Sequence, residues 1–340
     1  MKILAIQFRY LGDAVLLTPA LRAIKEHFAD CSLHVLVAEE VVPLLEHLPW
    51  LDRVWAFPRK RGSANLQRSW PVLRALRRER FDCSIDFVGS DRGALVSLLC
   101  GARERLAPRR TGGFFGRSFC YTTTVPTQRA EHQAQANFGV LSIWAIAAPA
   151  CPILEIRADP ERTGMAEQLM PRGAVLCHIG TSQPKKEWPL AQWVDFHRQA
   201  AAEGRELVFC AGAGAREQTL LAEFKKRATG APTLPALPEL ADFLAVLNQA
   251  HVFISGDTGP MHFAAGLGVP TISLFGPSSV QQWAPLGPKH RALQAAGCNC
   301  GGDTAVCVNA RHCMTNISPE QVLKTLEEIL VTGQCGTSAR

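Results

Sequence analysis

The chain has 340 residues, of which 47% are hydrophobic and 19% are charged, and this balance excludes an intrinsically disordered protein. The length suits two domains that each bury their own core. The formal net charge of +6 is uneven, because the first 150 residues hold 20 Lys and Arg against 13 Asp and Glu, which suggests an anionic partner or a solvated arginine-rich surface.

Strand and helix patterns alternate along the first half of the chain. Short apolar runs predict strands, and apolar residues spaced three or four apart predict helices. A turn at residues 10–13 separates the first strand from the first helix, which Pro19 should kink. The predicted strands are 2–8, 32–37, 53–56 and 83–87, and the predicted helices are 14–28, 41–47, 70–80 and 92–99.

The same alternation restarts after a proline-containing connector at residues 147–160. The predicted strands there are 174–178, 206–211, 251–255 and 271–275, and the predicted helices are 190–203, 215–227, 238–249, 259–266 and 319–330. Such alternation is typical of parallel sheets covered on both faces. The sequence therefore predicts an α/β protein of two Rossmann-like domains, residues 1–155 and 156–340. They would face a central cleft, with ligands at the carboxyl ends of the strands.

Two apolar segments bear on the expected location of the protein. The N-terminal run 2–6 stops at Gln7 and Arg9, which is typical of a buried strand rather than a secretory signal. Residues 138–154 are uncharged but contain two prolines, so we interpret them as a core helix that runs into the connector. We expect a soluble cytoplasmic protein, in which the 12 cysteines are thiols or metal ligands rather than disulfides.

The most distinctive loop is residues 256–262, Gly-Asp-Thr-Gly-Pro-Met-His, directly after a predicted strand. Small residues allow a tight turn, and Pro260 suits the first turn of a helix. The amides of such a helix start can bind a diphosphate, and Asp257 can accept hydrogen bonds from sugar hydroxyls. The alternative is an ordinary Asp N-cap before a buried helix, and the residues by themselves favour neither.

Two further loops also follow predicted strands. In the first, Gly12-Asp13 opens a helix, and Asp13 is a candidate general base if a partly dry cleft tunes its pKa; the alternative is again an N-cap. In the second, residues 180–189 carry Lys185 and Lys186, and a lysine near a helix start can clamp phosphate. The alternative for this second loop is a solvated basic surface.

Taken in order, these motifs resemble glycosyltransferase family nine, the lipopolysaccharide heptosyltransferases, over nearly the whole chain. Residues 81–86 and 90–92 resemble the branch that adds the third, side-branch heptose. The family motifs are matched by residues 9–13 with 17–21, by Lys-Glu-Trp-Pro at 186–189, by 257–262 with 264–265, and by 313–314 with 317–320.

The resemblance implies a GT-B fold and an inverting transfer of heptose from ADP-L-glycero-D-manno-heptose. Asp13 would deprotonate the acceptor hydroxyl, and Lys186 would neutralise charge on the leaving ADP. Asp257 would orient the donor sugar. The other implied donor contacts are Thr258 and Gly259 at the diphosphate, Glu217 near the ribose, and Thr181, Lys185 and His262.

No cofactor is expected for catalysis. The chain lacks Asp-x-Asp, the usual divalent-metal ligand of other glycosyltransferases, and a lysine with helix amides can take the place of that ion.

The resemblance also implies an anionic partner for the basic first half of the chain. The implied acceptor is the lipid A-linked core oligosaccharide, which is acidic through its Kdo sugars and phosphates. The protein would lie peripherally at the cytoplasmic face of the inner membrane of a Gram-negative bacterium, and no nucleic acid partner is expected. The candidate acceptor contacts are Arg59, Lys60, Arg61 and Arg92, and further candidates for the acceptor or the membrane are Arg68, Arg74, Arg77, Arg78, Arg109 and Arg110.

Four cysteines lie close together near the C-terminus, and His312 is beside the last of them. Their grouping resembles a structural zinc or iron–sulfur site, although Cys-x-Cys is tighter than the usual Cys-x-x-Cys. The alternative is a set of reduced structural thiols, and neither reading gives them a catalytic role. The four are Cys298, Cys300, Cys307 and Cys313.

Two other functions remain open at this point. One is a sugar-nucleotide enzyme of the same fold, such as a hexosyltransferase or an epimerase. The other is a nucleotide-sugar-binding protein that transfers nothing. The presence of both Asp13 and Lys186 argues against the second, because a binding protein has no need of a base.

Overall fold

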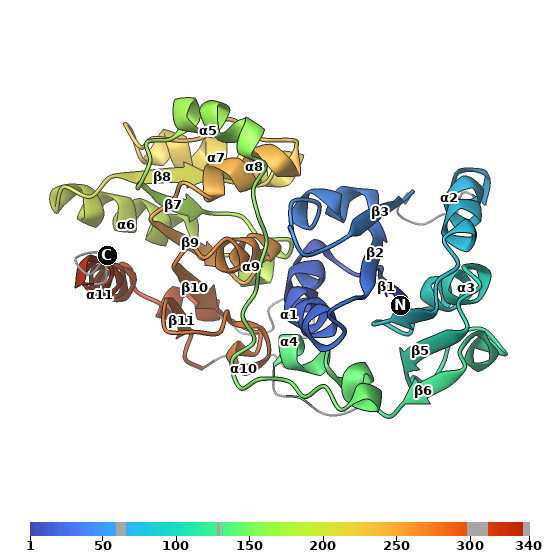
Figure 1. Cartoon of the computed structure of the whole chain (residues 1–340). Helices are drawn as coiled ribbons and strands as arrows, with labels where there is room; N and C mark the ends of the chain where they lie inside the picture. The colour runs from blue at the N-terminus through green and yellow to red at the C-terminus, as the bar shows by residue number, and fades with distance from the viewer. Residues whose placement is uncertain (59–65, 128–129, 131, 298–311, 336–340) are drawn as a thin grey trace. The chain divides into compact units, whose positions relative to one another are not determined.

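The chain is described here by a computed structural model, which covers residues 1–58, 66–127, 130, 132–297 and 312–335. It divides into two compact units, Met1–Arg157 and Ala158–Arg340. Each unit contains one sheet with helices packed on it (Figure 1), and every strand pair in both sheets is parallel. The α/β class predicted from the sequence is thereby confirmed.

The N-terminal unit is built on a six-stranded sheet with the order β3-β2-β1-β4-β5-β6. The strand order reverses between β1 and β4, which is where open doubly wound sheets bind their ligands. The strands are β1 (Lys2–Gln7), β2 (Ser32–Ala38), β3 (Arg53–Phe57), β4 (Cys83–Asp86), β5 (Glu104–Pro108) and β6 (Thr123–Val125).

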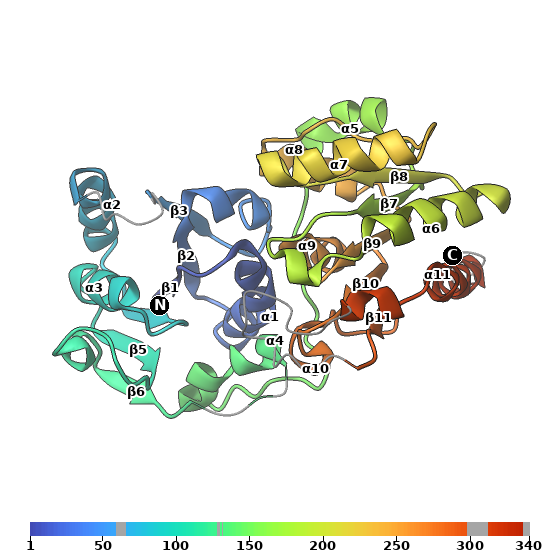
Figure 2. The same ribbon diagram turned by 180° about the vertical axis from the view of Figure 1, so that it is seen from behind.

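Helices cover both faces of this sheet, with α1 on one face and α2 and α3 on the other in both views (Figures 1 and 2). On the α2–α3 side, Leu4 and Ile6 of β1 share a buried core with Leu76 and Val96. The helices are α1 (Leu11–His27), α2 (Leu66–Arg78), α3 (Asp91–Leu99) and α4 (Gln133–Ala136), with 3-10 turns η1 (Glu39–Leu44), η2 (Arg117–Cys120) and η3 (Gly139–Trp144).

The C-terminal unit is built on a five-stranded sheet with the order β11-β10-β9-β7-β8. Here the order reverses between β7 and β9, so this neighbouring pair defines the expected ligand position. The strands are β7 (Val175–His178), β8 (Leu207–Cys210), β9 (Val252–Gly256), β10 (Thr271–Phe275) and β11 (His290–Gln294).

One large buried cluster joins this second sheet to three helices. Trp193 and Phe196 of α6, Phe224 of α7 and Leu326 of α11 belong to it, and α6 and α11 lie side by side (Figure 2). The helices are α5 (Thr163–Leu169), α6 (Leu190–Ala202), α7 (Ala215–Arg227), α8 (Leu240–Leu247), α9 (Gly259–Gly266), α10 (Val280–Trp283) and α11 (Pro319–Cys335), with turns η4 (Pro160–Arg162), η5 (Pro184–Lys186) and η6 (Cys313–Asn316).

The structure corrects two readings of the sequence. Residues 138–154 do not form a core helix, because η3 ends at Trp144, its C-cap Ala145 has a left-handed φ of 56°, and no helix or strand follows as far as residue 154. The first helix starts at Leu11 and runs through Pro19, so Asp13 lies inside it rather than in a preceding turn. Among the described residues, no helix is both long and apolar enough to cross a membrane.

Candidate active site

Asp13 lies in the first turn of α1, close to the carboxyl end of β1. Its side chain is 8% exposed, and the Tyr10 N–H donates to Oδ2 at 3.3 Å while the Arg9 guanidinium lies 3.4 Å from Oδ1. The N-cap of α1 is Tyr10, so the reading of Asp13 as the N-cap is wrong; Asp13 is the third residue of the helix, and its carboxylate accepts the N–H of the N-cap. Burial raises its pKa, and the Arg9 charge and the Tyr10 amide oppose that rise. A desolvated carboxylate of raised pKa is also what a general base requires.

The neighbouring strand β4 brings two more groups to the same edge of the sheet. Asp86, at its end, accepts the Tyr121 hydroxyl at 2.7 Å, and burial raises the pKa of this carboxyl. Arg92, at the start of α3, places its guanidinium 5.9 Å from the centroid of the Phe8 ring, just beyond β1. Arg92 therefore lies beside the strand that leads to Asp13. Asp86 and Tyr121 were not predicted, since their pairing is non-local.

In the C-terminal unit, Lys186 and Asp257 form an ion pair, with Nζ 2.6 Å from Oδ2. Asp257 follows β9 and Lys186 lies in the loop after β7, at the end of η5, so the adjacency of these two strands brings the groups together. The N-cap of α9 is Thr258, not Asp257, and the Asp257 carboxylate binds a cation instead. The reading of Asp257 as an ordinary N-cap is therefore wrong.

Trp188 anchors the loop that carries Lys186 to the core of the C-terminal unit. Its indole is 2% exposed, packs against Trp193 at a centroid distance of 4.7 Å, and donates to the Ile317 carbonyl at 2.9 Å. Because only one residue separates Trp188 from Lys186, this anchor fixes the backbone from which the ammonium reaches Asp257. The Lys-x-Trp-Pro pattern thus combines a charged group with its own attachment to the core.

Glu217 lies where the loops after β7 and β8 meet. Its carboxylate accepts the Gly212 N–H at 2.9 Å, and a Cβ on Gly180 would lie only 2.3 Å from its Oε2. His178 is buried, with Nε2 3.9 Å from the Glu217 carboxylate, and burial lowers its pKa, which favours the uncharged imidazole. The glycines at 180 and 212 thus leave the space that this carboxylate occupies.

Two residues that we did not single out from the sequence tie these loops together. The Arg216 guanidinium donates to the Glu187 carboxylate at 2.5 Å and also to the Thr181 carbonyl. Glu187 lies inside the 186–189 motif, and Arg216 directly precedes the predicted donor contact Glu217. Their pairing depends on strand order, which the local sequence does not contain.

The remaining predicted donor contacts lie in the loop after β7 and at the start of α9. Thr181, Lys185 and His262 are buried, and Thr258 and Gly259 are half-buried at the start of α9. The Thr181 hydroxyl donates to the Gln183 carbonyl at 2.7 Å, which shapes the turn before Lys185. Thr258 directly follows Asp257, and Lys185 directly precedes Lys186 in the sequence.

Some predicted residues lie outside the described part of the chain. These are Arg59, Lys60 and Arg61 of the acceptor set, and Cys298, Cys300 and Cys307 of the cysteine group. Cys313 is described and is buried in the core of the C-terminal unit, close to Gly276. Among the residues that the structure covers, no group of three or more His, Cys, Asp or Glu side chains is arranged to hold a metal ion.

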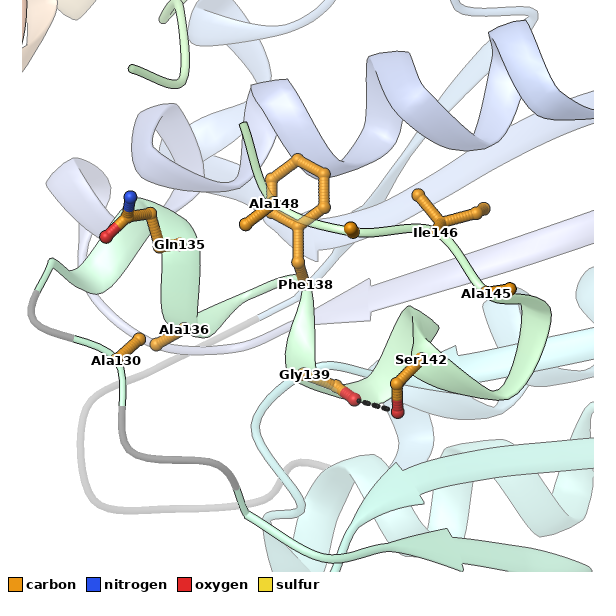
Figure 3. Close-up of a pocket in the computed structure, with 10 residues that line it drawn as sticks. Ala130, Gln135, Ala136, Phe138, Gly139, Ser142, Ala145, Ile146 and Ala148 are labelled. Atoms are coloured by element: carbon orange, nitrogen blue, oxygen red, sulfur yellow. Dashed lines mark hydrogen bonds between the residues drawn. The ribbon is translucent and has the colours of Figure 1, made fainter. Parts of the chain in front are cut away.

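A separate cavity of about 440 Å³ lies in the N-terminal unit, beside α4 and η3 (Figure 3). The Ser142 hydroxyl donates to the Gly139 carbonyl at its margin, at 2.8 Å. Small and apolar side chains dominate the lining, and none of the lining residues that the structure describes is ionisable. We therefore assign this cavity no part in acid–base chemistry.

A methyl group at Gly256 tests how closely the β9 loop and the Lys186 loop must pack. In Gly256→Ala the new Cβ would lie 2.9 Å from Thr181 Cγ2 and 3.1 Å from the Lys186 carbonyl. We expect a loss of stability of about 1–3 kcal/mol, because the Lys186 backbone must move away. We also expect a lower kcat.

Urea unfolding and initial-rate measurements check both effects. Gly164→Ala is the control, since its added Cβ has no described atom within 4 Å apart from the backbone of its own helix and its chain neighbours. A Gly256→Ala enzyme with unaltered stability and kcat would show that this packing is not required.

Solved structures of known proteins share this fold. A glycosyl transferase family 9 protein from Veillonella parvula matches with a TM-score of 0.82 at 20% identity, over 97% of both chains. The Escherichia coli ADP-heptose lipopolysaccharide heptosyltransferase II matches with a TM-score of 0.78 at 18% identity, over 98% of this chain and all of that one. The architecture is that of the GT-B glycosyltransferases, as the resemblance implied.

The sequence carries the assignment further. Residues 70–307 match glycosyltransferase family 9 (heptosyltransferase), and the chain belongs to that family. It is also 24% identical to a lipopolysaccharide heptosyltransferase 3 of Escherichia coli, over 82% of this chain and 84% of that one. The protein is therefore an enzyme that transfers a glycosyl group, and the family resemblance seen in its motifs is confirmed.

Proposed function

We propose that this enzyme moves heptose from ADP-L-glycero-D-manno-heptose to the lipopolysaccharide inner core with inversion at the anomeric carbon. The observation that carries the proposal is the Lys186–Asp257 pair at the strand reversal of the C-terminal sheet, at 2.6 Å. A cation held at that position, next to the start of α9, suits the diphosphate of a nucleotide sugar. The names of similar enzymes, which include heptosyltransferases of lipopolysaccharide, support heptose as the sugar.

The proposed roles divide between the two units. The C-terminal unit binds the donor: Asp257 holds Lys186 in place and accepts a sugar hydroxyl, while Thr258 and Gly259 offer amides to the diphosphate. Glu217 binds the ribose, and Thr181, Lys185 and His262 shape the donor loops. The N-terminal unit binds the acceptor, with Arg92 beside it, and the protein works at the cytoplasmic face of the inner membrane.

The reaction is a direct displacement. The Asp13 carboxylate takes the proton of the acceptor hydroxyl as its oxygen forms a bond to the anomeric carbon. The bond from that carbon to the diphosphate oxygen breaks, and its electron pair leaves with ADP. Lys186 and the amides at the start of α9 stabilise the charge that develops on the phosphate.

Mass spectrometry of truncated core oligosaccharides incubated with ADP-heptose and the enzyme tests the proposal. We expect a mass increase of one heptosyl residue, and acceptors that differ in their number of heptoses identify the acceptor position. Transfer from a UDP-hexose in preference to ADP-heptose would replace the proposal with a hexosyltransferase. Binding of ADP with no transfer to any core acceptor would indicate a binding protein instead.

A further inference from the structure

The segment that runs from the end of β5 into η2, residues 109–119, exposes phenylalanine side chains to an unusual degree. We call this segment the Phe loop; it lies beside β5 and β6 in the teal part of Figure 1. Phe115 is fully exposed, Phe119 is 82% exposed and Phe114 is 38% exposed. Several large apolar side chains gathered on a surface indicate contact with a partner or a membrane.

The Phe loop has a defined conformation. The Asp91 carboxylate accepts from the Arg117 guanidinium at 3.3 Å and from the Phe114 N–H at 3.4 Å. Gly113 has a φ of 91°, and a Cβ there would lie 2.4 Å from atoms of both Arg117 and Asp91. Directly after the loop, Cys120 is buried. The chain therefore buries Cys120 while Phe115 and Phe119 remain exposed to solvent.

Positive charge surrounds these phenylalanines. A cavity of about 310 Å³ beside the loop is lined by Arg109, Arg110 and Arg117. The first two are exposed, and within the described residues no carboxylate lies at ion-pair distance from either. Arginines without acidic partners attract phosphate groups, which they bind through paired N–H donors.

Neighbouring elements extend the apolar surface. Helix α3 packs against η2 and exposes Leu95 and Leu98. Aromatic rings between basic residues are typical of a surface that enters the headgroup region of a bilayer, where rings settle and cations meet anionic lipid.

We propose that the Phe loop docks the N-terminal unit on an anionic phospholipid bilayer. Phe115 and Phe119 enter the interface, and Arg109 and Arg110 bind lipid phosphate at the cavity. The loop starts at the carboxyl end of β5, on the same edge of the sheet as Asp13 beyond β1. Docking there would bring a lipid-anchored acceptor toward Asp13, and to this extent the inference rests on the proposed function.

Vesicle sedimentation of the full chain, without substrates, tests the docking surface. We expect binding to phosphatidylcholine vesicles with about 30% phosphatidylglycerol, and much weaker binding to phosphatidylcholine alone. Phe115→Ser/Phe119→Ser should lower the partition coefficient about tenfold or more, since two rings leave the interface. Arg109→Gln/Arg110→Gln should lower it by a similar factor, because each arginine near anionic lipid contributes about fivefold.

Matched control variants test whether a loss of vesicle binding is specific to the Phe loop. Arg172→Gln/Arg198→Gln removes two exposed arginines of the C-terminal unit, and Ile153→Ser removes an exposed apolar side chain elsewhere; both should bind as the wild type does. Trp70, 62% exposed on α2, offers the competing surface. Loss of binding in Trp70→Ser with retention in Phe115→Ser/Phe119→Ser would overturn the proposal.

Failure of the wild-type chain to bind anionic vesicles would also overturn the proposed docking. The Phe115→Ser/Phe119→Ser enzyme should retain transfer to a soluble, delipidated core oligosaccharide, and a loss there would mean that the loop has another role. If no heptose is transferred by any variant but loop-dependent vesicle binding persists, the proposed function fails and the docking surface stands.

Discussion

Replacing Asp13 with Asn is expected to lower kcat for heptosyl transfer by roughly 10²–10⁴-fold, because the amide cannot accept the proton of the acceptor hydroxyl. The Asn side chain keeps the shape of Asp13 and can still accept the Tyr10 N–H, so the fold should persist. Initial rates with ADP-heptose and a soluble core acceptor measure the loss.

Asp52→Asn is a close control for this change. Asp52 also accepts a backbone N–H, from Leu33 at 2.8 Å, and also pairs with a cation, Lys25 at 2.7 Å, but it precedes β3 and so lies at the opposite edge of the sheet. Its replacement should reduce stability and leave kcat almost unaltered. Full transfer activity in Asp13→Asn would remove Asp13 from the mechanism.

The pH profile follows from the surroundings of Asp13. Burial raises the pKa of this carboxyl above its ordinary value of about 3.9. A base must be ionised, so kcat/KM should fall as the pH drops through that raised pKa. Arg9→Gln removes the charge that opposes the rise, so the acid limb should move to still higher pH. An acid limb that Arg9→Gln does not move would mean that another group titrates.

Lys186→Met is expected to lower kcat by roughly 10²–10³-fold, because one donor to the developing phosphate charge is lost. The same change leaves the Asp257 carboxylate, 10% exposed, without its cation, so stability should fall by about 1–3 kcal/mol. Rates and urea unfolding measure the two effects separately.

The double variant Lys186→Met/Asp257→Asn tests whether the loss in Lys186→Met comes only from the unpaired Asp257 carboxylate. The neutral pair should recover most of the lost stability, because no buried charge remains unpaired, but it should not recover kcat. Lys226→Met is the control, since that side chain is 77% exposed on α7. Recovery of turnover in the double variant would show that Lys186 acts only by holding the β9 loop.

Much of the fold was readable from the sequence because its elements are local. Apolar runs gave β1, β2, β7, β9 and β10 nearly to the residue. The strands that escaped prediction are β5, β6 and β11, which lack a clear apolar run; β6 and β11 also lie at the edges of their sheets. A strand with few apolar residues forms because it pairs with a neighbouring strand, and the local sequence does not show which strand that is.

The chain by itself determined which loops carry charged and small residues, and that they follow strands. Only the tertiary structure decided what those residues touch. The order of the second sheet puts β7 beside β9, and this adjacency turns Asp257 from a candidate N-cap into the partner of Lys186. Likewise, the exposure of Phe115 became visible only when the chain around it was folded. Strand order and exposure depend on contacts between residues far apart in the chain, and local propensity does not encode them.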